Sequence, residues 1–268
     1  MPRILANGIN ICYETHGAGD ALILISGLGY DRWQWHKMTS GLSQYFQVIV
    51  FDNRGAGESD KPAGPYVAQL LADDTAALLE ALGHKQAFIM GHSMGGFVAQ
   101  ALALSRPDLV KKLILASTNF GGPRHIPVTQ EALAVLTDTQ ADPIERLKRG
   151  IAISTAPGWA ESHPDSVREW LEYRASHPLD LTGYNAQMSI GMALLAEAAC
   201  FEHKLKDVTA PTLILFGAHD KVVPPGNADL LAKQIPNSTI HILPNAGHLF
   251  PFEAPDEANG VIVKFLKG

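Results

Sequence analysis

The sequence has only two cysteines, Cys12 and Cys200, and they lie far apart in a chain of 268 residues. Two isolated thiols give no basis for a disulfide framework or for a metal site built on paired cysteines. A chain with so little cysteine fits a reducing compartment. We therefore predict a cytoplasmic protein.

Positive charge and long apolar runs are also scarce. The chain carries 21 Lys and Arg against 27 Asp and Glu, a formal net charge of −6, and no basic run favours nucleic acid or a membrane surface as a partner. No segment approaches the roughly 18 apolar residues that span a bilayer, and the start of the chain lacks the apolar region of a signal peptide. We predict a soluble protein that acts on a small molecule; whether it forms a homo-oligomer stays open.

Short apolar runs are what the sequence has instead, and they alternate with helical patterns. They lie at residues 21–25, 48–51, 86–90, 112–116, 212–216 and 239–243. Continuous apolar runs of this length are typical of parallel strands covered on both faces. Ahead of them, residues 4–14 break at Asn7-Gly8, which predicts a hairpin of two antiparallel strands. The sequence thus predicts an α/β fold with a doubly wound, mostly parallel sheet.

The alternation is interrupted between about residues 121 and 206. This stretch has no apolar strand, but it has helical patterns around 131–136, 167–174 and 187–201, separated by prolines. An insertion between two parallel strands emerges at the carboxyl edge of the sheet, where ligands bind. We therefore divide the chain into a first core segment (1–120), a helical cap (121–206) and a second core segment (207–268). Bulky side chains of the cap predict an apolar ceiling, made of Trp159, Trp170, Tyr173, Tyr184, Met188, Met192 and Leu195.

A candidate nucleophile lies in Gly91-His92-Ser93-Met94-Gly95, directly after the run at 86–90. A serine between glycines at a sharp strand-to-helix turn exposes its hydroxyl above the sheet. The alternative interpretation of these five residues is a Gly-rich turn that merely connects the strand to the helix. The strand pattern before the motif and the helical pattern after it favour Ser93 as a nucleophile.

A serine hydroxyl needs a histidine to take its proton and an acid to orient the imidazole. Asp220 follows the apolar run at 212–216, and His248 lies in a loop after the run at 239–243. Both residues come after apolar runs, so their side chains are expected at the same edge of the sheet as Ser93. Asp220 is therefore the candidate acid and His248 the candidate base.

The chain order Ser, Asp, His, together with the turn Asp52-Asn53-Arg54-Gly55-Ala56-Gly57-Glu58-Ser59, resembles the α/β-hydrolase superfamily, in particular its capped esterase and lactonase-like members. The resemblance extends over nearly the whole chain outside the cap. It implies that Ser93 is the nucleophile, that His248 acts first as general base and then as general acid, and that Asp220 orients the imidazole.

Acyl chemistry also needs donors for a negatively charged oxygen. One is predicted to be the backbone amide of Met94, at the amino end of a helix. The second is predicted to be the amide of Leu28, because Ser26-Gly27-Leu28-Gly29 is similar to the family's oxyanion loop, with serine in place of the usual histidine. A simple tight turn is the alternative interpretation of these glycines.

Together these features predict a cofactor-independent serine hydrolase that cleaves a carboxylic ester or lactone through an acyl-enzyme. A carbon–carbon bond hydrolase of ring-cleavage products is the alternative, although such enzymes usually carry tryptophan after the catalytic histidine, where this chain has Leu249. A hydrolase-like receptor without catalysis is an alternative of another class, which multiple turnovers of a short aryl ester would exclude. No histidine or cysteine pattern predicts a metal site.

Overall fold

An eight-stranded sheet forms the centre of the computed structural model, which describes residues 1–138 and 140–268. The strand order is β1-β2-β4-β3-β5-β6-β7-β8. Strand β2 runs antiparallel to β1 and β4, and the other neighbours are parallel. The predicted hairpin and the mostly parallel sheet are therefore confirmed. The strands are β1 (Arg3–Ala6), β2 (Ile9–His16), β3 (Ala21–Ile25), β4 (Gln47–Phe51), β5 (Ala87–His92), β6 (Val110–Ala116), β7 (Thr212–Gly217) and β8 (Ser238–Leu243).

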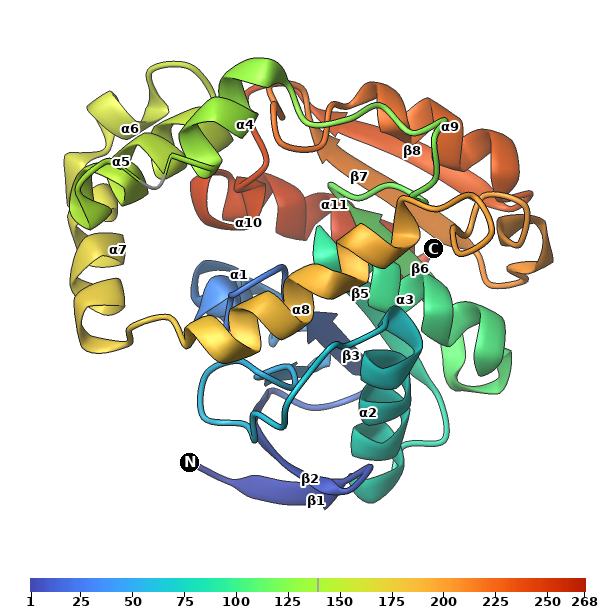
Figure 1. The fold of residues 1–268 in the computed structure, drawn as a ribbon. Helices are drawn as coiled ribbons and strands as arrows, with labels where there is room; N and C mark the ends of the chain where they lie inside the picture. Colours follow the sequence, from blue (N-terminus) through green and yellow to red (C-terminus); the bar gives the residue numbers. More distant parts are fainter. Residues whose placement is uncertain (139) are drawn as a thin grey trace.

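Helices cover both faces of this sheet (Figure 1). Helices α2, α3 and α9 pack on one face, and α1, α10 and α11 pack on the other. Short 3₁₀ helices, η1 to η3, connect some of the elements. The bounds are η1 (Arg32–Trp35), α1 (His36–Leu42), α2 (Ala68–Ala81), α3 (Met94–Ser105), η2 (Pro107–Leu109), η3 (Leu205–Asp207), α9 (Gly226–Gln234), α10 (Phe250–Glu253) and α11 (Pro255–Lys267).

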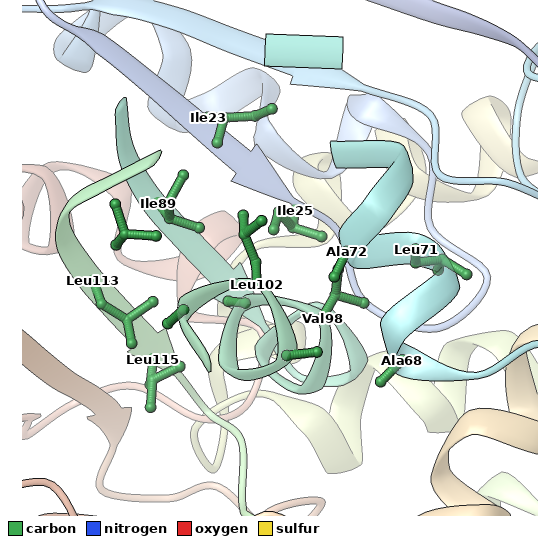
Figure 2. Close-up of a cluster of buried hydrophobic side chains, with 14 of the residues drawn as sticks. Ile23, Ile25, Ala68, Leu71, Ala72, Ile89, Val98, Leu102, Leu113 and Leu115 are labelled. Atoms are coloured by element: carbon green, nitrogen blue, oxygen red, sulfur yellow. The ribbon is translucent and has the colours of Figure 1, made fainter. Parts of the chain in front are cut away.

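The central strands are apolar throughout because their side chains alternate between two cores. In β3, Ile23 and Ile25 belong to the core under α2 and α3, whereas Leu22 and Leu24 belong to the core under α1 and α11. This alternation follows from the two-residue period of a strand. Figure 2 shows the first core, where strand residues meet Val98 and other side chains of α3. Each fully buried Leu or Ile contributes roughly 1.5–3 kcal/mol of transfer free energy.

The segment between β6 and β7 is helical in its described residues. Its elements are α4 (Gln130–Leu136), α5 (Pro143–Ser154), α6 (Trp159–Ser162), α7 (Pro164–Ser176) and α8 (Leu181–Leu194). Helix α8 crosses the front of the molecule, while α4 to α7 gather at one side (Figure 1). A Cβ on Gly183 of α8 would lie 1.9 Å from the Gly55 carbonyl oxygen, and one on Gly121 would lie 2.5 Å from that of Leu194. Helix α8 therefore rests on loops that follow β4 and β6, at the carboxyl edge of the sheet.

Two details of the predicted cap helices are wrong. The pattern at 187–201 predicted one helix, but α8 begins earlier because the Asp180 side chain accepts the Gly183 amide at 2.7 Å and caps it. Helix α5 was not predicted, because Pro143 was interpreted as a separator. Instead, Asp142 accepts the amides of Ile144 and Glu145, and the proline stands in the first turn, where a missing N–H has no consequence.

None of the helices in the described residues is long and apolar enough to cross a bilayer.

Candidate active site

Ser93 lies at a strained turn between β5 and α3. Its backbone has φ 55° and ψ −120°, a conformation that non-glycine residues rarely adopt. A Cβ on Gly91 would lie 2.2 Å from the Gly95 carbonyl oxygen, and a Cβ on Gly95 would lie 2.2 Å from that of Ile25. Both glycines are therefore required for the chain to turn this sharply against β3. The Ser93 amide donates to the Ala116 carbonyl at 2.9 Å, which anchors the turn to β6.

The imidazole of His248 and the carboxylate of Asp220 form a buried pair, with the two residues 6% and 3% exposed. His248 Nδ1 donates to Asp220 Oδ2 at 2.8 Å. The other carboxylate oxygen, Oδ1, accepts the amides of Val222 at 2.9 Å and Val223 at 2.7 Å. These contacts fix the carboxylate, so His248 carries its proton on Nδ1 and keeps the Nε2 lone pair free to accept another.

His248 lies directly beside the turn that carries Ser93. The side chain of His92, the residue before Ser93, donates from Nε2 to the His248 carbonyl at 2.8 Å, and the two rings are 4.8 Å apart between centroids. Among the described residues, no hydrogen bond joins Ser93 Oγ to the His248 ring. Such bonds are often long before a substrate binds. The structure thus brings the three predicted residues to one edge of the sheet and joins two of them by a hydrogen bond.

The loop after β3 lies against the nucleophile, since a Cβ on Gly27 would stand 3.3 Å from Ser93 Cβ. The Gly27 amide donates to Gln34 Oε1 at 2.9 Å, and the Gly29 amide donates to Gln187 Oε1 at 3.0 Å. Between them, the Leu28 amide has no hydrogen-bond partner among the described residues, and neither has the Met94 amide at the start of α3. Both amides are thus free of partners within the described part of the chain, as a donor to an oxyanion must be.

A model of the alpha/beta hydrolase fold family matches residues 20–255. The chain belongs to the alpha/beta hydrolase fold family. It is 30% identical to the putative non-heme bromoperoxidase BpoC of Mycobacterium tuberculosis, over 96% of this chain and 98% of that protein. A meta-cleavage product hydrolase from Pseudomonas fluorescens IP01 superposes with a TM-score of 0.84 at 26% identity, covering 100% of this chain and 97% of that one. A thermophilic esterase from Thermogutta terrifontis gives a TM-score of 0.82 at 29% identity, covering 100% and 98%.

This alpha/beta hydrolase has two further site residues that the sequence did not reveal, Gln34 and His92. Because Gln34 Oε1 accepts the Gly27 amide, its Nε2 must be the donor to His92 Nδ1, at 2.9 Å. Burial, and the nearby positive charge of His248 when it is protonated, lower the pKa of His92 to about 3, so its ring stays neutral. In the sequence, His92 stands only at the variable position before Ser93 in the Gly91–Gly95 motif, and no local pattern marks Gln34.

The bulky residues of 121–206 that were predicted as a ceiling differ in burial. Trp170 is only 2% exposed and packs with Leu249 and Phe252, beside the loop of His248. Met188 and Met192 are 38% and 63% exposed on α8. Trp170 therefore packs the helical segment 121–206 against the core, and the two methionines leave apolar surface exposed on α8.

A cavity of about 330 Å³ lies where the α5–α6 connection meets the loops of His219 and Asn245. Ser93 does not line it, so this cavity is not the space above the nucleophile. Within the part of the chain that the structure describes, no group of three His, Cys, Asp or Glu side chains could hold a metal ion.

Proposed function

We propose that this alpha/beta hydrolase cleaves carboxylic esters, open-chain or cyclic, through an acyl-enzyme on Ser93. The observation that carries the proposal is the buried Asp220–His248 pair. A hydrogen bond from His92, the residue before Ser93, to the His248 carbonyl holds this pair beside the nucleophile turn. The amides of Leu28 and Met94, which have no partner among the described residues, also support the proposal. The esterase of similar structure supports the choice of an ester bond.

In the proposed reaction, Ser93 Oγ attacks the substrate carbonyl carbon while His248 Nε2 takes the hydroxyl proton. Asp220 stabilises the imidazolium that forms. The amides of Leu28 and Met94 donate to the oxygen that becomes negative, an interaction that strengthens as the tetrahedral intermediate forms. When the intermediate collapses, His248 returns the proton to the leaving alcohol, and the acyl group remains on Ser93.

Water completes the cycle. His248 accepts a proton from the water molecule as its oxygen attacks the acyl carbon, and a second tetrahedral intermediate forms at the same amides. Its collapse breaks the bond to Ser93 Oγ, which recovers the proton from His248 while the carboxylic acid leaves. We assign residues 121–206 the role of a cap that shields this chemistry from bulk water and selects the acyl or alcohol portion.

A carbon–carbon bond hydrolase is the second candidate, favoured by the similarity to a meta-cleavage product hydrolase. The same nucleophile and base would serve it. Leu249 follows His248 here, where such enzymes usually carry tryptophan, so we rank ester cleavage first.

The test is hydrolysis of short p-nitrophenyl esters by the wild type and by Ser93→Ala. We expect Ser93→Ala to lose roughly 10⁴-fold or more in kcat, and the addition of His248→Ala to cause little further loss, because the residues act as a unit. Ser105→Ala, at the exposed far end of α3, is the matched control and should keep full activity. A Ser93→Ala enzyme with most of its kcat would refute the proposal.

A second panel separates the substrate classes. Lactones and dienoate ring-cleavage products are compared with the aryl esters as substrates of the wild type. Faster turnover of the dienoates than of any ester would replace our first candidate with the second. Tight binding without turnover of any compound would favour a receptor.

A further inference from the structure

Both backbone groups of Gly29, next to the proposed oxyanion donor, are bonded by side chains of the cap. The Gly29 amide donates to Gln187 Oε1 of α8 at 3.0 Å. The Gly29 carbonyl accepts from Arg174 of α7 at 2.9 Å, and the Arg174 guanidinium lies 5.3 Å from the centre of the Tyr30 ring. Two different cap helices therefore bind one residue of the oxyanion loop.

Gln187 is built into its position. Its side chain is wholly buried, and its Nε2 donates to the Arg54 carbonyl at 2.8 Å. One turn earlier, the backbone of α8 touches that of Gly55 at Gly183. Since the two polar ends of the Gln187 amide face an N–H and a carbonyl, a flipped amide would put like groups together. The acceptor offered to Gly29 is thus fixed.

The oxyanion loop has a geometry that needs such an acceptor. The Tyr30 amide donates to the Gly27 carbonyl at 3.2 Å, which closes a turn over residues 27–30. Gly29 has φ +71°, the value of the third residue of a type II turn. The central peptide of a β-turn, here between Leu28 and Gly29, has a different orientation in type I and type II turns. The contact with Gln187 holds the N–H of this peptide, which is that of Gly29, in the observed orientation. It thereby restricts the backbone of Leu28, whose own N–H belongs to the preceding peptide.

The core holds the first half of this loop, and the Ser26 hydroxyl also reaches the Asp31 carbonyl at 3.2 Å. Gln34 accepts the Gly27 amide, and Asn53 Nδ2 donates to the Ser26 carbonyl at 3.0 Å. In the second half, the Tyr173 hydroxyl from α7 donates to Asp31 Oδ2 at 2.8 Å. Leu28 lies between Gly27, whose amide the core holds, and Gly29, whose amide and carbonyl are both held by cap side chains.

We propose that Gln187, assisted by Arg174, is a positioning residue through which the docked cap aims the Leu28 amide at the oxyanion. In this view the oxyanion site is complete only while α8 rests on the core, so the cap contributes to the chemical step as well as to substrate selection. The expected change in kcat rests on the proposed esterase function. The claim that the cap holds the oxyanion loop in place rests on the hydrogen bonds of Gly29 alone.

The experiment compares Gln187→Met with Ser189→Ala, both on α8. Ser189 Oγ accepts the Tyr66 amide at 2.9 Å and lies 2.8 Å from the Tyr66 carbonyl and 2.6 Å from the Ala186 carbonyl of its own helix. Its loss therefore removes one contact between the same helix and the core, and it leaves the contacts of the helix with Gly55 and with the oxyanion loop in place. Because removal of a whole oxyanion donor lowers kcat by about 10²–10³-fold, we expect Gln187→Met to lose about tenfold or more in kcat with little change in KM. Ser189→Ala should stay close to the wild type in both.

Two readouts distinguish positioning from a general loss of structure. Affinity for an aryl boronic acid, whose tetrahedral adduct with Ser93 carries an oxygen at the oxyanion position, should fall with kcat in Gln187→Met and not in Ser189→Ala. Hydrogen exchange of the Gly29 and Tyr30 amides should also become faster only in Gln187→Met, and this readout needs no turnover. Arg174→Met, at a half-exposed position, takes the place of Gln187→Met if that variant does not fold.

Unchanged kcat, boronate affinity and amide exchange in Gln187→Met would overturn the inference, as would equal losses in Ser189→Ala. A wild type that hydrolyses no ester, or a Ser93→Ala variant as active as the wild type, would instead refute the proposed function. The exchange measurement would then still decide whether the cap holds the loop.

Discussion

The His92 side chain donates from Nε2 to the backbone carbonyl of His248 at 2.8 Å. On its other side, His92 Nδ1 accepts from Gln34, which in turn accepts the Gly27 amide. One neutral, buried hydrogen-bond chain therefore connects the loop of the candidate base with the loop of the candidate oxyanion donor. The polar atoms of two side chains, Gln34 and His92, thus form a bridge between these two loops.

The first prediction tests this chain with Gln34→Met, which keeps the length of the side chain and removes both of its polar ends. The Gly27 amide and His92 Nδ1 would then be buried without partners, at a cost of about 1–3 kcal/mol for each group. We expect a lower free energy of unfolding, measured by urea denaturation, and a lower kcat on aryl esters.

The matched control is Gln69→Met, because Gln69 also donates two side-chain hydrogen bonds, to Asp73 and Ser105, but at an exposed position. It should change stability by less than about 0.5 kcal/mol. If Gln34→Met were as stable and as active as the Gln69 variant, the hydrogen-bond chain through Gln34 and His92 would have no structural or catalytic importance.

The second prediction concerns Asp220→Asn. The amides of Val222 and Val223 both donate to Oδ1, so the asparagine must present its oxygen to them and its NH₂ group to His248. An NH₂ group facing Nδ1 makes that nitrogen an acceptor and moves the histidine proton to Nε2, the atom that must accept the Ser93 proton. We expect kcat to fall by roughly 10⁴-fold with the fold intact, as measured by steady-state hydrolysis and circular dichroism.

Asp229→Asn, an exposed carboxylate on α9, removes the same charge and should keep wild-type activity. An Asp220→Asn enzyme that retained a tenth of the wild-type kcat would show that His248 is not the base or that Asp220 does not orient it.

The strands of the parallel part of the sheet could be predicted because they are short apolar runs, and the antiparallel pair because of its Asn7-Gly8 turn. The order Ser93, Asp220, His248 could be predicted because each residue follows one of these runs. Contacts that assemble the rest of the candidate site leave no comparable local pattern. Gln187 meets Gly29 across 158 positions of sequence, and Gln34 meets His92 across 58. The unpaired state of the Leu28 amide depends on the partners that its neighbours find in three dimensions, so its identity was suggested only by resemblance.

The third prediction uses two glycines of α8. A Cβ on Gly183 would lie 1.9 Å from the Gly55 carbonyl oxygen, whereas a Cβ on Gly191 would meet no atom within 4 Å. We expect Gly183→Ala to push α8 away from the core and lower both stability and kcat. Gly191→Ala should raise stability by up to about 1 kcal/mol, because alanine is the better helix former. Thermal unfolding and ester hydrolysis measure both effects, and equal behaviour of the two variants would contradict the observed docking of α8.

The last prediction concerns Glu253, which bridges the cap and the loop of His248. Its Oε1 accepts the Ala156 amide, and its Oε2 accepts the Gly247 amide, each at 2.9 Å. Burial, and to a smaller extent the negative charge of Asp220, raise the pKa of Glu253 to about 7, against the opposing effect of the two amides and of His163. Between the ordinary glutamate pKa of about 4.3 and this value, the folded protein binds more protons than the unfolded chain. The contribution of Glu253 to stability is therefore full below about pH 4 and declines as the pH rises through 7.

Glu253→Gln removes this titration. Its amide oxygen can accept only one of the two backbone N–H groups, so the variant should be less stable than the wild type in mild acid. As the pH rises to 8, the wild type loses the stability that Glu253 contributes in mild acid. The difference in unfolding free energy between the wild type and Glu253→Gln should therefore narrow between pH 5 and pH 8, by at most about 3 kcal/mol. Urea denaturation at pH 5 and pH 8 measures it, with the exposed Glu257→Gln as the charge-matched control. A difference that stayed constant or widened with pH would show that Glu253 is ionised in the folded protein throughout this range, and that the bridge to the cap is always a carboxylate.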